Sequence, residues 1–213
     1  MKLFKVFLVV GVLGIALVFA GTQPASADVA MSFTSAITSS QSQLSLGWVF
    51  TTNSAVTVDA LGYYDYQGDG FITPHTVGIF DSGGTLLISA SLSAGTSDPL
   101  TGSFRYVSIS PYTLTAGQTF VIAGTTEGPS DPWAYGNAPG SIQGFTVNPA
   151  ISIGNNASRY LYQGDNILRD PPNPYIYTVY AGPNFQAVPL PPSLLLLGSG
   201  LLGLVGWRRF KKS

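Results

Sequence analysis

The chain has 213 residues, with 9 Lys and Arg against 10 Asp and Glu, no cysteine and one histidine. A chain without cysteine has no disulfide scaffold, no Cys-ligated zinc or iron–sulfur centre and no thiol nucleophile, and one histidine excludes multi-histidine metal ligation. The even charge balance provides no basic face for nucleic acid. Hydropathy then divides the chain into residues 1–27, 28–187 and 188–213.

The first 27 residues have the features of a secretory signal peptide. Lys2 and Lys5 precede an apolar run over residues 7–20, which is shorter than the roughly 20 residues of a membrane span. Ala25 and Ala27 provide the two small side chains that signal peptidase requires. We expect cleavage after Ala27, with Asp28 as the new N-terminus. The alternative is an uncleaved anchor helix.

The last 26 residues form a second, tripartite signal. Its parts are a proline motif, an apolar run over residues 194–207 and a basic end. The motif is Val188, Pro189, Leu190, Pro191, Pro192 and Ser193, and the basic end contains Arg208, Arg209, Lys211 and Lys212. As a helix the apolar run covers about 21 Å, against about 30 Å of hydrocarbon. The basic end stays cytoplasmic by the positive-inside rule, which leaves residues 28–187 outside the membrane.

This order of parts resembles the sorting signal of the PEP-CTERM family, with Val188–Ser193 in place of Pro-Glu-Pro. The resemblance implies that a membrane-embedded exosortase recognises the tail, cuts near the proline motif and releases or re-attaches the protein. It also implies a Gram-negative bacterium that makes exopolysaccharide. A plain C-terminal membrane anchor is the alternative. The expected destination is the cell surface, the outer envelope or the extracellular matrix, with transient anchoring by the C-terminal helix.

The segment between the two signals is acidic. Residues 28–187 contain three arginines, no lysine and ten acidic residues, a net charge of −7. Such a surface disfavours nucleic acid and anionic membranes. It suits extracellular water, divalent cations or neutral sugars.

The same segment has the pattern of an all-β domain. Apolar and polar residues alternate along Leu86–Ser93, with period 2, and turn residues at Gln67–Gly70 and Ser82–Gly84 separate such runs. The predicted strands are Leu46–Thr51, Val56–Leu61, Thr76–Asp81, Leu86–Ser93, Phe104–Ser110, Thr119–Thr125, Ile142–Val147, Ser158–Tyr162 and Tyr175–Tyr180. The predicted core is Val56, Val58, Leu61, Val77, Ile79, Leu86, Ile88, Phe104, Val107, Phe120 and Ile122. Short strands at this spacing predict a β-sandwich or jelly roll.

Several runs of this segment are similar to a β-domain of unknown function that recurs in bacterial secreted and surface proteins. They are Gly47–Phe50, Val58–Asp65, His75–Asp81, Gly84–Leu87 and Leu114–Gly117. The resemblance implies a non-catalytic β-sandwich and transfers no functional residue.

Three acidic residues are candidates for a calcium site. Asp65 and Asp69 frame a glycine-rich turn, and Asp81 could complete the ligand set, because Ca²⁺ takes six to eight oxygens in flexible turns. The alternative is a solvated turn in which Asp side chains accept backbone N–H groups. No other cofactor is indicated.

Five aromatic residues are candidates for glycan contact, namely Tyr63, Tyr64, Tyr66, Trp133 and Tyr135. Flat aromatic faces beside Asp or Asn suit a neutral polysaccharide, through apolar stacking and hydrogen bonds. The alternative is ordinary packing, because aromatic residues are favoured in strands.

The sequence shows few features of an enzyme active site. His75 follows a proline at a predicted strand start, where we expect it at the surface, and no Gly-x-Ser-x-Gly elbow accompanies it. Nothing in the spacing of the aspartates selects the carboxylate pair of a glycosidase. We therefore expect a non-enzymatic surface or matrix protein with a structural or adhesive role in exopolysaccharide. A carbohydrate-binding module is the second hypothesis and a secreted hydrolase the third.

Overall fold

The computed structural model describes residues 28–41, 43–126, 131–136, 142–162, 164–165, 167–176 and 179–188. The expected leader up to Ala27, the proline motif beyond Val188, the apolar run and the basic end lie outside the described residues. Across the described ranges, no helix is long and apolar enough to cross a membrane.

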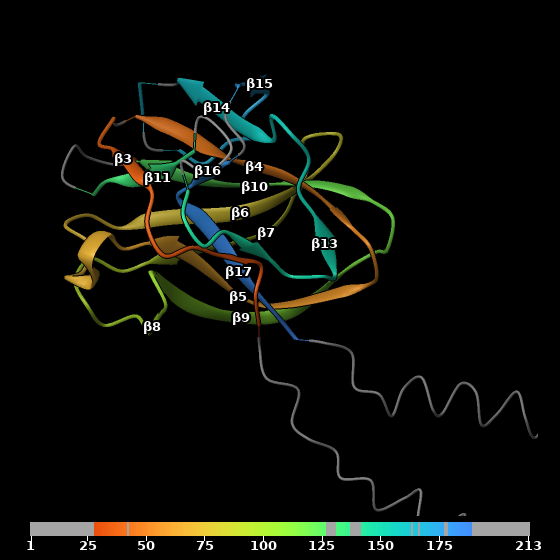
Figure 1. Ribbon diagram of the computed structural model, residues 1–213, viewed down its shortest axis with the longest axis horizontal. Coiled ribbons are helices and arrows are strands. Elements are labelled where there is room, and N and C mark those ends of the chain that lie inside the picture. The colour runs from red at the N-terminus through yellow and green to blue at the C-terminus, as the bar shows by residue number, and fades with distance from the viewer. Residues whose placement is uncertain are drawn as a thin grey trace, which may run out of the picture. The chain divides into compact units, whose positions relative to one another are not determined.

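The described segment is all-β, as predicted, and two larger sheets dominate it (Figure 1). The first has the order β1-β17-β5-β9-β8. Its strands are Asp28–Val29 (β1), Pro183–Val188 (β17), Val56–Tyr64 (β5), Phe104–Leu114 (β9) and Leu100–Thr101 (β8). Neighbouring strands of this sheet pair antiparallel.

The second large sheet has the order β15-β14-β4-β10-β6-β7, and β13 also pairs with β4. Its strands are Asn173–Pro174 (β15), Ser158–Tyr162 (β14), Leu44–Thr52 (β4), Thr119–Thr126 (β10), His75–Asp81 (β6), Leu86–Leu92 (β7) and Ile151–Ser152 (β13). The turn predicted at Ser82–Gly84 joins β6 and β7, which pair antiparallel and form a hairpin.

Two small sheets and one short helix complete the fold. The first small sheet, in the order β16-β11-β3, contains Tyr180–Ala181 (β16), Trp133–Tyr135 (β11) and Ile37–Ser39 (β3). The second pairs Thr146–Val147 (β12) with Met31–Ser32 (β2). The 3₁₀ helix η1 spans Tyr66–Gly68.

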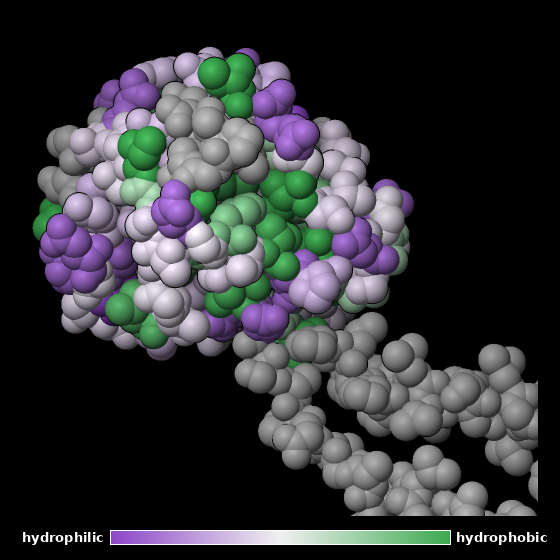
Figure 2. All heavy atoms as spheres, in the orientation of Figure 1, coloured by the Kyte–Doolittle hydropathy of each residue, from purple (hydrophilic) through white to green (hydrophobic). Residues whose placement is uncertain are grey.

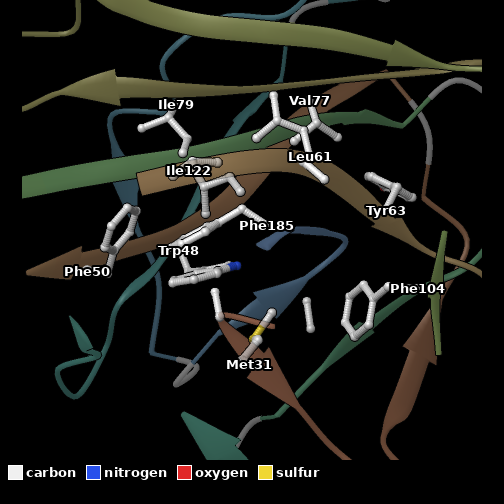
Figure 3. Packing of buried hydrophobic residues seen from close by; sticks show 14 of the residues in the cluster. Met31, Trp48, Phe50, Leu61, Tyr63, Val77, Ile79, Phe104, Ile122 and Phe185 are labelled. Carbon is white, nitrogen blue, oxygen red and sulfur yellow. The ribbon is translucent and has the colours of Figure 1, made fainter. Parts of the chain in front are cut away.

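The core lies between the two larger sheets. Trp48 and Phe50 of β4 meet Phe185 of β17, with ring centroids 6.1 and 5.2 Å apart, and all three are fully buried (Figure 3). Most of the predicted core residues are buried as well, namely Val56, Val58, Leu61, Val77, Ile79, Phe104, Phe120 and Ile122. Sheets packed on one another in this way are consistent with a sandwich.

Three core predictions fail wholly or in part. Leu86 is exposed, and Ile88 and Val107 are only half-buried. Leu86 opens β7, the last strand in the order of its sheet, where a register shift interrupts the pairing with β6. An edge strand has a neighbour on one side only, so its apolar residues are incompletely covered.

Sequence alternation also misplaced some short strands. Only Thr146–Val147 forms a strand within the predicted Ile142–Val147, and the predicted Tyr175–Tyr180 strand is wrong, because pairing occurs before it in β15 and at its end in β16. Conversely, β11 forms at Trp133–Tyr135, where the sequence pattern predicts no strand. Strands this short depend on distant partners, here β3 and β16, which a local pattern does not reveal.

The two ends of the domain are neighbours in one sheet. Asp28 of β1 pairs with Ala187 of β17, and Val188 pairs with Thr57 of β5. The first residue of the proline motif therefore belongs to the sheet. Asp28, the expected new N-terminus, lies beside it.

The surface carries few charges, since 9% of the chain is charged. Figure 2 shows one face, where polar residues are scattered among residues of intermediate hydropathy and apolar residues gather around the position of β17. The strongly hydrophilic residues of that face lie mostly towards its margins, with one group of them at its left edge.

Candidate functional site

An aromatic cleft of about 280 Å³ lies where the small sheet β16-β11-β3 meets β4 and β14. Its lining residues are Ser39, Gln41, Leu44, Leu46, Trp133, Tyr135, Tyr160, Tyr162, Tyr175 and Tyr180. In Figure 1, β3, β11, β16 and β14 lie together at the end of the domain opposite to the one where β17 finishes. The cleft is thus remote from the two ends of the domain.

One wall of the cleft follows from the register of β14 on β4. Tyr160 and Tyr162 are two residues apart on β14, so they project from the same face of the strand. Tyr160 pairs with Leu46 and Tyr162 pairs with Leu44, which places the aromatic rings beside leucine side chains on that face. The Tyr-x-Tyr spacing thereby builds an apolar wall with phenol groups along it.

The floor is a hydrophobic cluster separate from the main core. Trp133 and Tyr180 are buried in it together with Leu44 and Leu46. The rings of Trp133 and Tyr180 meet edge to face, with centroids 4.9 Å apart and an interplanar angle of 80°. Trp133 Nε1 donates a hydrogen bond of 3.2 Å to the Gln41 carbonyl oxygen, which ties the indole to the segment after β3.

The rim consists of tyrosines at right angles to one another. The ring of Tyr160 stands at 88° to that of Tyr162 and at 83° to that of Tyr175. Tyr162 is 56% exposed and Tyr175 39%. The lining residues within the described ranges carry neither a carboxylate nor a cationic group. Such a cleft can offer ring faces and hydroxyl or amide hydrogen bonds to an uncharged ligand.

The structure divides the five predicted glycan-contact residues. Trp133 and Tyr135 line the aromatic cleft. Tyr64 and Tyr66 lie outside it: Tyr66 is the first residue of η1 and is 41% exposed, and Tyr64 ends β5 and is buried. The prediction for Tyr63 is wrong, because this side chain is fully buried against His75.

Sequence reasoning did not single out four tyrosines of the cleft, namely Tyr160, Tyr162, Tyr175 and Tyr180. The spacing of two between Tyr160 and Tyr162 in a predicted strand was a signal for a shared face. Tyr180 reaches the cleft through the pairing of β16 with β11, and Tyr175 through the hydrogen bond from its N–H to the Ser158 carbonyl oxygen. Neither contact has a sign in the local sequence pattern.

His75 is completely buried, so the expectation of a surface histidine is wrong. Its ring stacks on Tyr63 with centroids 4.1 Å apart and an interplanar angle of 6°. Nδ1 donates to the Thr125 carbonyl oxygen at 2.9 Å, and Nε2 lies 3.4 Å from a carboxylate oxygen of Asp131. This surrounding is that of a packed core residue.

Asp131 fastens the segment that carries Trp133 and Tyr135 to the rest of the domain. Its carboxylate accepts the backbone N–H groups of Ile72 and Thr73 and the Thr73 hydroxyl. Burial alone raises the pKa of Asp131, but contact with His75 and these hydrogen bonds outweigh burial and lower the pKa from 3.8 to about 2. Asp131 is therefore an ionised carboxylate that stabilises the fold through these hydrogen bonds.

The calcium hypothesis does not fit the positions of its residues. Asp65 is buried and accepts a hydrogen bond of 2.6 Å from Arg105 Nε, so a cation already neutralises it. Asp69 is exposed, and Asp81 accepts the N–H groups of Gly83 and Thr85 in the hairpin turn at the far end of β6. Backbone hydrogen bonding, first of all from Thr85, lowers the pKa of Asp81. Within the described ranges, no three His, Cys, Asp or Glu side chains gather as metal ligands.

Comparison with known proteins places the domain in a family. No curated protein matches the chain. The family model described as a domain of unknown function, DUF4082, matches residues 31–167, which is more than half of the chain and includes most of both large sheets. The expected resemblance to a β-domain of unknown function is thus confirmed, and the chain belongs to the DUF4082 family.

Proposed function

We propose that this protein is an exported, non-enzymatic surface or matrix protein whose β-sandwich domain adheres to neutral polysaccharide through the aromatic cleft. The observation that carries the proposal is the concentration of one tryptophan and five tyrosines around a single cavity. Sugar rings have apolar C–H faces and polar edges, so they pair with aromatic faces framed by hydroxyl and amide groups.

The charge of the site and of the domain favours a neutral glycan. The described lining residues are uncharged, so they offer no counter-ion to a uronate or a sulfate. Residues 28–187 carry a net charge of −7, which repels acidic polymers at moderate salt. A neutral polysaccharide needs no counter-ion and is not repelled by the acidic domain.

The two terminal signals supply the route. Signal peptidase would cut after Ala27, and an exosortase-type enzyme would process the tail near Val188–Ser193, where the pattern resembles PEP-CTERM. A carbohydrate-binding module acting alone would share the cleft but would need no such tail. Intact-mass analysis of the exported protein tests this route, because a mature chain that retains Lys212 contradicts processing.

Affinity electrophoresis in gels that contain the producer's own exopolysaccharide, or one of a panel of neutral polysaccharides, tests the binding. We expect retardation of the wild-type domain and its loss in Tyr162→Ala, since Tyr162 is on the exposed rim. Leu86→Ala is the matched control, because Leu86 is also exposed but lies on β7 and does not line the cleft. Unretarded wild-type protein in every gel, or equal losses in both variants, refutes the proposal.

A further inference from the structure

We propose that the glycan path continues beyond the aromatic cleft to a second subsite at η1, so that the domain grips an internal stretch of a long polysaccharide. This inference rests on the proposed function. A pocket of about 510 Å³, here called the η1 pocket, adjoins this helix. The lining residues that matter for the argument are Thr34, Ser35, Ala36, Tyr66, Gln67 and Ser103.

The two cavities are connected by one stretch of chain. Thr34, Ser35 and Ala36 line the η1 pocket, and Ser39 and Gln41 line the aromatic cleft. The residues between them belong to β3, and at about 3.3 Å per residue the step from Ala36 to Ser39 is about 10 Å. Ile37 is 43% exposed along this step. Figure 1 shows β3 and the short coil of η1 at the same end of the domain.

The η1 pocket has the same chemical character as the cleft. Tyr66 presents an exposed ring, and Thr34, Ser35, Gln67 and Ser103 add neutral hydrogen-bonding groups. Asp65 is the one charged residue among the described lining residues. Arg105 neutralises it at 2.6 Å, and both side chains are buried. The aromatic cleft and the η1 pocket therefore both offer a neutral sugar an aromatic ring and uncharged hydrogen-bonding groups.

The turn that carries Tyr66 is held firmly, although it contains an unfavourable backbone conformation. Gln67 has φ of 66° in the left-handed region, which costs free energy for a residue with a Cβ atom. Arg105 donates to the Gly68 carbonyl oxygen at 3.0 Å, and the Asp65 carboxylate accepts the Gly70 N–H. Strain that the surroundings enforce in this way is common at ligand-binding positions, and here it lies in the residue after Tyr66.

Two subsites on one polymer predict a dependence on chain length. A short fragment occupies the aromatic cleft alone, whereas a long fragment adds the η1 pocket at a high effective concentration. An aromatic contact of this kind is worth a factor of about two to ten in affinity. Affinity should therefore rise by up to about tenfold once a fragment is long enough to reach both cavities.

Isothermal titration calorimetry with fragments of two to twelve sugars, cut from the polysaccharide that retards the wild-type domain, tests this inference. We expect Tyr66→Ala to abolish the gain with length and to leave the affinity for short fragments unchanged. Tyr66→Phe keeps the ring and should keep the gain, and Tyr162→Ala should weaken binding at all lengths. Affinity that is independent of length, or a gain that survives in Tyr66→Ala, overturns the second subsite while the proposed function stands. Absence of binding by every fragment also overturns the second subsite, whereas the proposed function is decided by the electrophoresis in polysaccharide gels.

Discussion

Replacement of the buried Arg105 by alanine should be among the most destabilising single substitutions in this domain. The guanidinium is buried and donates four hydrogen bonds, one to the Asp65 carboxylate and three to the carbonyl oxygens of Thr96, Asp98 and Gly68. Alanine removes all four and leaves a buried carboxylate without its cation. Both the turn at η1 and the segment before β8 lose their common anchor.

The magnitude follows from the burial of the pair. Removal of one partner from a buried ion pair costs about 3–5 kcal/mol, because the remaining charge stays desolvated. Natural domains have a free energy of unfolding of about 5–15 kcal/mol in total. The Arg105→Ala variant should therefore still fold at low temperature, but with a much smaller free energy of unfolding. At a shift of about 2–4 °C per kcal/mol for a domain of this size, a loss of about 4 kcal/mol lowers Tm by about 10 °C.

Urea unfolding followed by tryptophan fluorescence measures the loss, because Trp48 and Trp133 are both buried. Arg169→Ala is the matched control: Arg169 also contacts an aspartate, Asp165, at 2.7 Å, but both side chains are about 40% exposed. Exposed pairs contribute little, so this variant should unfold almost as the wild type does. Equal losses in the two arginine variants would refute the argument from burial.

The double variant provides a second test of the same reasoning. Asp65→Ala combined with Arg105→Ala removes the orphaned carboxylate, so the pair of changes should cost less than the sum of the single ones. The expected coupling is about 2 kcal/mol, at the upper end of the range for residues in direct contact. Strict additivity would contradict it.

Three further outcomes are expected. Gly47→Ala should destabilise the domain by about 3 kcal/mol or more in urea unfolding, because a Cβ atom there would lie 1.8 Å from the Ile122 carbonyl oxygen. Asn184→Ala should cost about 2 kcal/mol or more in the same assay, since the buried Asn184 side chain pairs with both the N–H and the carbonyl group of Met31; an unchanged midpoint would contradict this bridge. Ionised Asp131 should contribute about 2 kcal/mol to the free energy of unfolding above pH about 4, and this contribution should be lost as the pH falls towards 2, because folding lowers the pKa of Asp131 from 3.8 to about 2. When the urea midpoint is measured against pH, Asp131→Asn should show a smaller decrease than the wild type between pH about 4 and about 2.

The sequence predicted the long strands well because their patterns are set locally. The predicted bounds of five long strands agree with the observed bounds to within four residues, namely those of β4, β5, β6, β9 and β10. Apolar runs that turn residues separate can be recognised within one segment of sequence. Leu86 shows the limit of this reasoning. Its alternation was correct, but burial depends on whether a neighbouring layer covers the edge, and that is a property of the whole fold.

The candidate site was predictable only in part. Trp133 and Tyr135 stood out because they occur close together in a stretch rich in Pro and Gly. The burial of His75 could not be foreseen, because it is enclosed by Tyr63 and Asp131, and Asp131 is 56 positions away in the chain. Likewise, Asp65 resembled a calcium ligand until Arg105, 40 residues later, was found beside it.

The order of strands in the first sheet governs when the domain can fold. β17, the last strand of the domain in chain order, lies between β1 and β5, so the earliest strand has no partner in that sheet until the latest one arrives. Contacts between residues so far apart in sequence form slowly. A chain made from its N-terminus therefore cannot complete this sheet until residues 183–188 are available. In the folded domain, a force that pulls on either end acts on the hydrogen bonds that join β1 to β17.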